Sequence, residues 1–119
     1  MKQLVAILRP GKLTQTKEAL SKIGCVAMTS VRVYGRGRQK GLRGSVLTND
    51  SRTPQVVVMK YLPKKMIYLM VRDRELHPVV QTLIRVNQTG EHGDGKIFVL
   101  DLKSAQRIRT NEKGEAAIR

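Results

Sequence analysis

The sequence contains one cysteine, Cys25, no tryptophan, and aromatic residues amounting to only 3% of the chain. A single cysteine excludes an internal disulfide and a multi-cysteine metal site, so we expect Cys25 to fill space in the core. No apolar run approaches the roughly 18 residues of a membrane-spanning helix, and the start of the chain lacks the apolar segment of a secretory signal. We therefore expect a cytosolic protein whose 119 residues form a single domain over 1–119.

Acidic residues are also scarce: 9 Asp and Glu oppose 23 Lys and Arg, which gives a formal net charge of +14. So basic a domain predicts an anionic partner. Nucleic acid is one candidate, because counterion release gives basic proteins affinity for phosphate backbones. The few aromatic residues, however, do not form the aromatic strand pair on which an RNA-recognition sheet stacks bases. A basic ferredoxin-like nucleic-acid-binding domain remains the alternative function.

Catalytic patterns are missing as well. His77 and His92 are the only histidines, and no Ser-His-Asp, His-x-Glu or paired-carboxylate spacing is evident. Asp94 lies between glycines and is typical of a turn rather than of a general base. The sequence therefore predicts a protein that is not an enzyme.

What the sequence does contain is glycine mixed with positive charge. Residues 34–44 hold four glycines and four cations, and residues 89–96 and 107–110 form two further glycine-rich or basic clusters. Glycine lets backbone N–H groups approach a ligand, while Arg and Lys attract phosphate or carboxylate oxygens. One such loop is more often a solvated hairpin tip, but three in a small domain predict a composite anion site.

The first half of the chain predicts a strand, a helix and a second strand. Residues 3–8 form an apolar run expected to be a central strand buried on both faces or nearly so. Residues 12–23 follow helical spacing and end before Gly24, a typical helix C-terminal glycine. Residues 26–34 alternate as a half-exposed strand that leads into the basic loop.

The second half of the chain repeats this pattern after an excursion of low apolar content at 41–55. We expect either a long mobile loop or a protruding hairpin in which 56–59 pairs with the outgoing arm. A break at 62–65 precedes a strand at 66–71. Asp73 is a plausible N-cap for the helix that follows, although Pro78 suggests that the regular helix begins nearer His77. Gly90 is expected to end this helix. Its predicted stripe is Leu76, Val79, Val80, Leu83 and Ile84. A last strand at 97–100 precedes a polar tail, 104–119, expected to fray.

The order β-α-β, loop, β-α-β predicts an α+β, ferredoxin-like fold. The chain also resembles the PII signal-transduction family in order and over nearly its whole length. The matching motifs are Gly37-Arg38-Gln39-Lys40-Gly41, Leu62-Pro63-Lys64, Thr89-Gly90, Gly93-Asp94-Gly95-Lys96-Ile97-Phe98-Val99 and Arg107-Ile108-Arg109-Thr110 followed by Gly114. The resemblance implies a homotrimer that binds ATP or ADP between subunits and 2-oxoglutarate with Mg-ATP. It also implies a long T-loop at about 37–61 that grips targets, and a C-terminal segment at about 101–119.

The resemblance assigns a role to individual residues. The implied nucleotide-binding residues are Thr29, Gly35, Gly37, Arg38, Gln39, Met70, Gly93, Asp94, Gly95, Lys96, Arg107 and Arg109, the last two reaching the phosphates from a neighbouring subunit. The implied 2-oxoglutarate-binding residues are Arg9, Gln39, Lys40, Gly41, Lys64, His92 and Gly93. Magnesium would bind the amide oxygen of Gln39, in keeping with its preference for oxygen ligands.

This sequence departs from the family pattern in its T-loop. It has no tyrosine between Gly35 and Met59, so nucleotidyl transfer to a loop-tip tyrosine is not expected. The loop is longer than usual, Arg36 replaces a common phenylalanine, and the pattern is most similar to the nitrogen-fixation-associated subgroup. We expect Arg43, Arg52 and Lys60 to face an acidic surface of the regulated protein, which would be nitrogenase, an ammonium transporter or another nitrogen-metabolism target.

Overall fold

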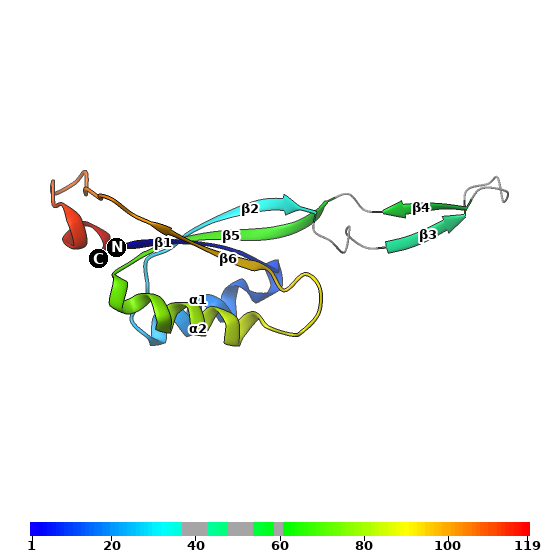
Figure 1. Ribbon diagram of the computed structural model, residues 1–119, viewed down its shortest axis with the longest axis horizontal. Coiled ribbons are helices and arrows are strands. Elements are labelled where there is room, and N and C mark those ends of the chain that lie inside the picture. Colours follow the sequence, from blue (N-terminus) through cyan, green and yellow to red (C-terminus); the bar gives the residue numbers. More distant parts are fainter. Residues whose placement is uncertain (37–42, 48–53, 59–60) are drawn as a thin grey trace.

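The computed structural model describes residues 1–36, 43–47, 54–58 and 61–119, and it has an antiparallel four-stranded sheet with two helices on one face (Figure 1). The strand order is β2-β5-β1-β6, and each neighbouring pair is antiparallel. This order, together with the helices between β1 and β2 and between β5 and β6, confirms the ferredoxin-like α+β prediction. The elements of the body are β1 (Lys2–Leu8), α1 (Leu13–Lys22), β2 (Thr29–Gly35), β5 (Leu62–Val71), α2 (Leu76–Asn87) and β6 (Lys96–Asp101).

Strand β1 is central, as predicted, but only one of its faces is fully buried. Leu4, Ala6 and Leu8 are at most 2% exposed, whereas the residues between them are half-buried. The prediction of burial on both faces is wrong because both helices pack on the same side of the sheet. The core between sheet and helices is completed by Leu20 from α1, Val79 and Leu83 from α2, and Ile67, Leu69 and Val71 from β5.

The opposite face of the sheet is apolar and open. The strand register aligns the outward residues of β1, β2, β5 and β6 in rows, so that Val5, for example, lies between Tyr68 and Phe98. The larger apolar side chains on this face include Val31, Met70, Phe98 and Leu100, which are 36–47% exposed. A face of this kind is rarely left in water, because contiguous apolar patches mark interaction sites.

Strand β2 begins at Thr29 rather than at Val26 because α1 ends in a Schellman motif. Gly24 has φ +85°, its N–H bonds to Ser21 O at 3.0 Å, and the Cys25 N–H bonds to Leu20 O at 2.9 Å. These bonds hold residue 25 against the end of the helix. Cys25 packs half-buried against the core, as expected, and burial raises the pKa of its thiol.

Strand β5 begins at Leu62, so the predicted break at 62–65 is wrong. The pairing with β1 stops at Lys65, opposite Leu8, and Pro63 is paired only with Tyr34 of β2. At that point β5 has a neighbour on one side only. A proline is tolerated in a strand where its missing N–H costs no ladder bond.

Helix α2 is preceded by a 3-10 turn, Asp73–Glu75, and Asp73 does not cap it. The Asp73 carboxylate instead accepts a bond from the N-terminal amine at 2.9 Å. Pro78 is the third residue of α2, where an N–H would have no acceptor within the helix, so the helix begins one residue before His77. The helix ends at Asn87 rather than at Gly90, and Ile84, predicted to face the sheet, is 39% exposed.

The excursion contains a hairpin, the second of the two predicted alternatives. Strand β3 (Arg43–Leu47) pairs antiparallel with β4 (Pro54–Val58), and Figure 1 shows them beyond the end of the β2–β5 ribbon. The tail does not fray as predicted: a bridge joins Gln106 to Lys113, and a 3-10 helix covers Gly114–Ile118. A shorter 3-10 turn, Pro10–Lys12, leads into α1. Within the described residues no helix has the length and apolar character needed to cross a membrane.

Candidate functional site

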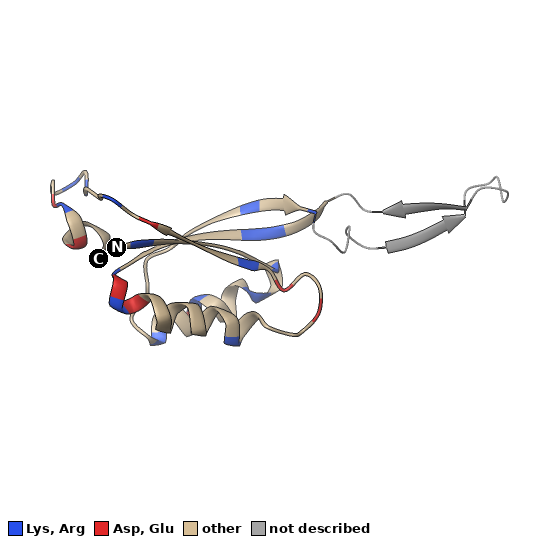
Figure 2. Cartoon of the chain, in the orientation of Figure 1, with Lys and Arg blue, Asp and Glu red and all other residues tan. Residues whose placement is uncertain are grey.

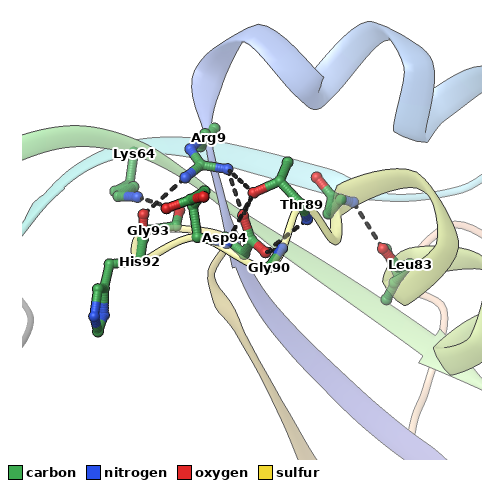
Figure 3. Close-up of polar contacts among 10 residues, drawn as sticks. Arg9, Lys64, Leu83, Thr89, Gly90, His92, Gly93 and Asp94 are labelled. Carbon is green, nitrogen blue, oxygen red and sulfur yellow. Dashed lines mark hydrogen bonds and ion pairs between the residues drawn. The ribbon is translucent and has the colours of Figure 1, made fainter.

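The loop between α2 and β6 is organised around the carboxylate of Asp94 (Figure 3). One oxygen of Asp94 accepts the N–H groups of Thr89 at 2.7 Å and Gly90 at 2.9 Å, and the other accepts the Thr89 hydroxyl at 2.5 Å. The bonds from Thr89, its hydroxyl first, hold the pKa of Asp94 well below its usual range. Asp94 therefore acts as the turn former that the sequence predicted.

Two cations from other elements bind the same loop. Arg9, at the end of β1, pairs with Asp94 at 2.5 Å and donates from Nη2 to His92 O at 2.8 Å. Lys64, near the start of β5, donates from Nζ to Gly93 O at 2.7 Å. Figure 3 shows both side chains converging on consecutive carbonyls of the loop. Residues far apart in the sequence thus form one positively charged cluster.

Lys64 is unusual because it is only 8% exposed. Burial, and then the neighbouring Arg9 charge, lowers the pKa of its ammonium group, while Asp94 acts in the opposite direction. Among the described residues this lysine has one carbonyl acceptor, which uses one of the three donor hydrogens that an ammonium carries. It is therefore well suited to bind an anion that enters beside it.

Glycine is required at two positions of the loop. Gly95 has φ +116°, and a Cβ there would lie 1.8 Å from Ile7 O, so the loop packs directly on the β1 backbone. Gly93 has φ +98°, and a Cβ there would lie 3.2 Å from a guanidinium nitrogen of Arg9. A side chain at residue 95 would push the loop away from β1, and one at residue 93 would strain the backbone and crowd Arg9.

A hollow of about 480 Å³ adjoins the cluster. Arg9, Lys12 and Lys64 bring positive charge to it, and apolar or uncharged residues form the rest of its wall. The remaining lining residues are Pro10, Gly11, Gln15, Leu62 and Pro63. Its size and charge suit a small anionic molecule.

The structure brings together most of the predicted residues that it describes in this region. Arg9, Lys64 and Gly93 are in contact, His92 takes part through its carbonyl, and Gly35 lies beside Lys64, since a Cβ on it would be 3.9 Å from Lys64 Cγ. Sequence reasoning missed Lys12, whose position in the hollow follows from the 3-10 turn before α1. The predicted residues Gly37, Arg38, Gln39, Lys40, Gly41, Arg52 and Lys60 lie outside the described residues, and the side chain of Arg43 is not described.

The other predicted nucleotide residues lie toward the opposite end of the sheet. Ile7 of β1 is paired with Lys96 on one side and with Met66 on the other. Met70 is four residues beyond Met66 on β5, so it lies about 13 Å further along the sheet than the level of Lys96. Strand β6 carries the chain from Lys96 to Asp101, about 17 Å, before it reaches Arg107. One chain therefore does not bring Arg107 and Arg109 to the glycine loop at 93–96.

Arg107 is held within its own segment. Its Nη1 pairs with Glu112 at 2.8 Å, and its Nη2 donates to the backbone oxygens of Ala116 and Arg119. Arg109 is exposed. A second hollow, of about 690 Å³, lies at this end of the sheet between the 23–27 connection, Met70, Arg72 and the C-terminal segment. Arg72, which sequence reasoning also missed, lies 3.6 Å from Glu75 and 3.7 Å from Glu115.

Comparison with known proteins identifies similar chains over the full length. A family model described as nitrogen regulatory protein P-II matches residues 1–112. The chain is 46% identical over 121 residues to nitrogen fixation nifHD region GlnB-like protein 2 of Methanobacterium ivanovii, covering 99% of each chain. It is 44% identical over 122 residues to nitrogen regulatory protein P-II of Klebsiella oxytoca, covering 99% of this chain and 100% of that relative.

A solved structure gives the same result. The chain superposes on Arabidopsis thaliana PII bound to citrate with a TM-score of 0.77 and 31% identity. The match covers 99% of this chain and 89% of that one. Sequence and structure comparisons therefore agree over the body of the fold.

Proposed function

Because the chain belongs to the nitrogen regulatory protein P-II family, a family of regulatory rather than catalytic proteins, we propose that it senses ATP, ADP and 2-oxoglutarate and controls a protein of nitrogen metabolism. The names of its nifHD-region relatives support a link to nitrogen fixation. The control would be exerted through the T-loop at 37–61. The nucleic-acid-binding alternative is not favoured, since the family match extends over the whole domain.

The observation that carries the proposal is the Arg9–Lys64 pair of cations at the Gly93 loop. A 2-oxo dicarboxylate requires positive charge at its carboxylates, and the hollow beside this pair supplies three cations, Lys12 included. The Arabidopsis relative is described as bound to citrate, which is also a polycarboxylate. Lys64 would bind one carboxylate of 2-oxoglutarate, with Arg9 next to it and the Lys40–Gly41 segment and His92 close by.

The nucleotide would lie against the glycine loop at 93–96. Lys96, Gly37 and Arg38 would hold its phosphates, and Thr29 and Met70 would line the rest of the pocket. Arg107 and Arg109 would arrive from a neighbouring subunit, since the strand lengths keep them away from this loop in their own chain. Arg107 would exchange Glu112 for a phosphate oxygen on nucleotide binding.

Magnesium would enter with the nucleotide. Asp94, the acidic residue of this loop, already accepts bonds from Arg9, Thr89 and Gly90, so its oxygens are occupied by donors. The phosphates and the amide oxygen of Gln39 would therefore be the ligands, which suits a hard cation that keeps several open positions. When bound, the ion neutralises phosphate charge and gives the 2-oxo acid a place to coordinate.

A homotrimer accounts for both the split nucleotide residues and the open face of the sheet. Trimer formation would cover the exposed Val31, Phe98 and Leu100 side chains and bring one chain's Arg107 and Arg109 to the next chain's loop. Ligand occupancy would then be coupled to subunit geometry. Binding at such a site would be reported to the T-loop through Gly35, the last residue of β2.

The proposal is tested by thermal melting of the intact protein with ATP, ADP, 2-oxoglutarate, and Mg-ATP plus 2-oxoglutarate. Ligand at about 100 times its Kd stabilises the native state by about 2.7 kcal/mol. We expect each nucleotide to raise the Tm, and 2-oxoglutarate to raise it further only with Mg-ATP. Unchanged melting with saturating nucleotide would contradict the sensing function.

A further inference from the structure

Strands β2 and β5 place two cations directly opposite each other. Arg32 is paired with Lys65, and Lys65 is in register with Leu8, whose side chain is buried on the helix-covered face. Arg32 and Lys65 therefore project from this same face, and Figure 2 shows the positive bands adjacent on the two strands. Arg32 is exposed and Lys65 half-buried.

This arrangement does not help the fold. Like charges directly opposite in an antiparallel pair are destabilising, because the two side chains lie on the same face about 5 Å apart. Ion pairs elsewhere in the described part of the chain hold most of its carboxylates, and none of them includes Arg32 or Lys65. The carboxylates in these pairs belong to Asp73, Glu75, Asp94, Asp101, Glu112 and Glu115.

Exposed aromatic residues extend the surface toward the hairpin. Tyr34 is two residues beyond Arg32 on the same face, opposite Pro63, and is 63% exposed. Tyr61, just before β5, is 60% exposed. Tyrosine and arginine are the residue types that contribute most at protein–protein interfaces. In a sequence with so few aromatic residues, two exposed tyrosines lie beside a cation pair that has no ion-pair partner among the described residues, a combination typical of an interaction surface.

We propose that this basic–tyrosine surface, made of Arg32, Tyr34, Tyr61, Pro63 and Lys65, binds an acidic segment of the regulated protein. The inference rests on the proposed function, in that it assumes a protein target, and it assigns the body of the domain a contact separate from the T-loop. Glutamate or aspartate side chains would neutralise Arg32 and Lys65, while the apolar part of the segment packs on the tyrosine rings.

The surface suits a protein segment better than a nucleic acid. Three of its five residues are tyrosine or proline, whereas a phosphate backbone is bound mainly by cations along a track of successive charges. Tyrosine beside proline offers an apolar area of the kind found at the centre of protein interfaces.

The surface also adjoins the effector hollow. Pro63 belongs to both, and Leu62 and Lys64 of the hollow alternate along β5 with surface residues. A ligand that shifts Lys64 would therefore shift the strand that carries Lys65. Effector state and binding of the acidic segment are thereby coupled through β5.

The test uses fluorescence anisotropy of the intact protein with a labelled peptide of Glu-Glu-Leu repeats, and an oligothymidylate of matched net charge as the competing class. The variant is Arg32→Glu/Lys65→Glu. Lys17→Glu/Lys22→Glu, on the exposed face of α1, makes the same change in net charge elsewhere and is the matched control. We expect the first variant to weaken peptide binding by at least about tenfold and the control to weaken it by less than about twofold.

Three further variants separate binding from folding. Arg32→Glu alone places a negative charge on β2 opposite the positive charge of Lys65 on β5. We therefore expect this variant to raise the Tm while it weakens peptide binding. Tyr34→Ala should weaken peptide binding several-fold, and Tyr34→Phe should leave the affinity for the peptide unchanged. ATP binding, measured by calorimetry on the same variants, should be unchanged, so failure of this surface and failure of nucleotide sensing give different results.

Equal weakening by the two double variants would mean that only net charge matters and would overturn the proposal. Stronger binding of the oligothymidylate than of the peptide, lost in Arg32→Glu/Lys65→Glu, would assign the surface to phosphates instead. If that double variant does not fold, Arg32→Gln and Lys65→Gln, each compared with Lys17→Gln, decide the matter with the same readout.

Discussion

Lys64 is a buried charge for which we propose a ligand. The protein places this ammonium under the 89–95 loop at 8% exposure, although burial disfavours its charged form. One carbonyl and no carboxylate bonds to it directly among the described residues. A carboxylate ligand bound beside Lys64 would offset the cost of burying its charge.

We predict that Lys64→Gln weakens 2-oxoglutarate binding much more than ATP binding. Loss of a charge-assisted hydrogen bond costs about 1.5–3 kcal/mol, which is roughly a tenfold to hundredfold change in Kd. Calorimetric titration with Mg-ATP present measures both constants. Lys17→Gln on α1 is the control and should change neither. Equal weakening of both ligands by Lys64→Gln would place Lys64 in the fold rather than in the effector site.

Gly95 is predicted to be the least replaceable glycine of the loop. In Gly95→Ala the new Cβ would meet Ile7 O at 1.8 Å with φ at +116°, and strain of this kind costs about 1–3 kcal/mol before the clash is counted. Gly11→Ala, where no atom lies within 4 Å, is the matched control. Urea unfolding should show a large loss in the free energy of unfolding for Gly95→Ala and little change for Gly11→Ala. Similar stability of the two variants would refute the close packing of loop and β1.

The Asp94 carboxylate gives the loop a pH dependence. Its pKa is lowered in the folded protein, so the stability it contributes is complete above the ordinary aspartate pKa of about 4 and is lost as pH falls through the folded value. Asp94→Asn should therefore melt below the native protein at neutral pH, and the difference in Tm should shrink as pH drops below about 4. Glu18→Gln, on the exposed side of α1, controls for the charge change. If the difference in Tm between the native protein and Asp94→Asn grew as the pH fell, the Asp94 carboxylate would not be the source of this pH dependence.

At the residue scale the sequence predicted identities better than contacts. The resemblance pointed to Arg9, Lys64 and Gly93, and the structure joins them. It did not predict that the carbonyls of His92 and Gly93 would be the acceptors, nor that Arg107 would be held by Glu112. Backbone acceptors have no side-chain signature, and the Arg107 contact depends on the folding of residues 106–118, which local polarity does not reveal.

At the scale of elements, the body and the hairpin are separate units of pairing. Strands β3 and β4 are bonded to each other in a two-stranded sheet, while the other four strands form their own sheet. The body therefore does not depend on β3 and β4 for its ladder bonds. This division lets the hairpin vary in sequence without altering the pairing of the four-stranded sheet.

We predict that replacing 43–58 with a short Gly-Ser linker leaves the body folded. The core lies between the helices and the four-stranded sheet, so circular dichroism should record one cooperative melting transition close to that of the native chain. Target binding that depends on the T-loop should be lost. A protein without a cooperative transition would mean that the hairpin stabilises the body.

Several element boundaries were wrong for reasons that can be stated. Pro63 suggested a break, but β5 lacks a β1 partner there. Asp73 resembled an N-cap, but the N-terminal amine lies next to it. Both errors arise because the deciding group is distant in sequence. The Gly24 terminus of α1, by contrast, depends on local backbone geometry and was predicted correctly.

At the scale of the whole molecule, the apolar outer face of the sheet is the strongest argument for self-association. Val31, Met70, Phe98 and Leu100 are 36–47% exposed on a face without helices. Sequence alternation indicated only half-exposed strands, because the pattern does not reveal whether the second face meets water or another chain. The trimer came from the family resemblance alone.

We predict that Phe98→Asp dissociates the assembly and reduces nucleotide binding. A charge in the centre of an apolar interface cannot be paired and is costly to bury. Val99→Asp is a matched control, since Val99 is equally exposed at 47% but is in register with Leu4, on the other face of the sheet. Light scattering should give a trimer mass for the native chain and the control and a smaller mass for Phe98→Asp. A monomeric native chain would contradict the shared site.

The most direct test of nucleotide-dependent 2-oxoglutarate sensing is calorimetric titration of 2-oxoglutarate into the protein with no nucleotide, with Mg-ADP and with Mg-ATP. In the proposed site Lys64 and Arg9, held at the Gly93 loop, would supply cations to the dicarboxylate, and Mg-ATP would supply the remaining contacts. We predict appreciable binding only with Mg-ATP. Binding of 2-oxoglutarate with the same strength in all three conditions, or no binding in any of them, would contradict nucleotide-dependent 2-oxoglutarate sensing.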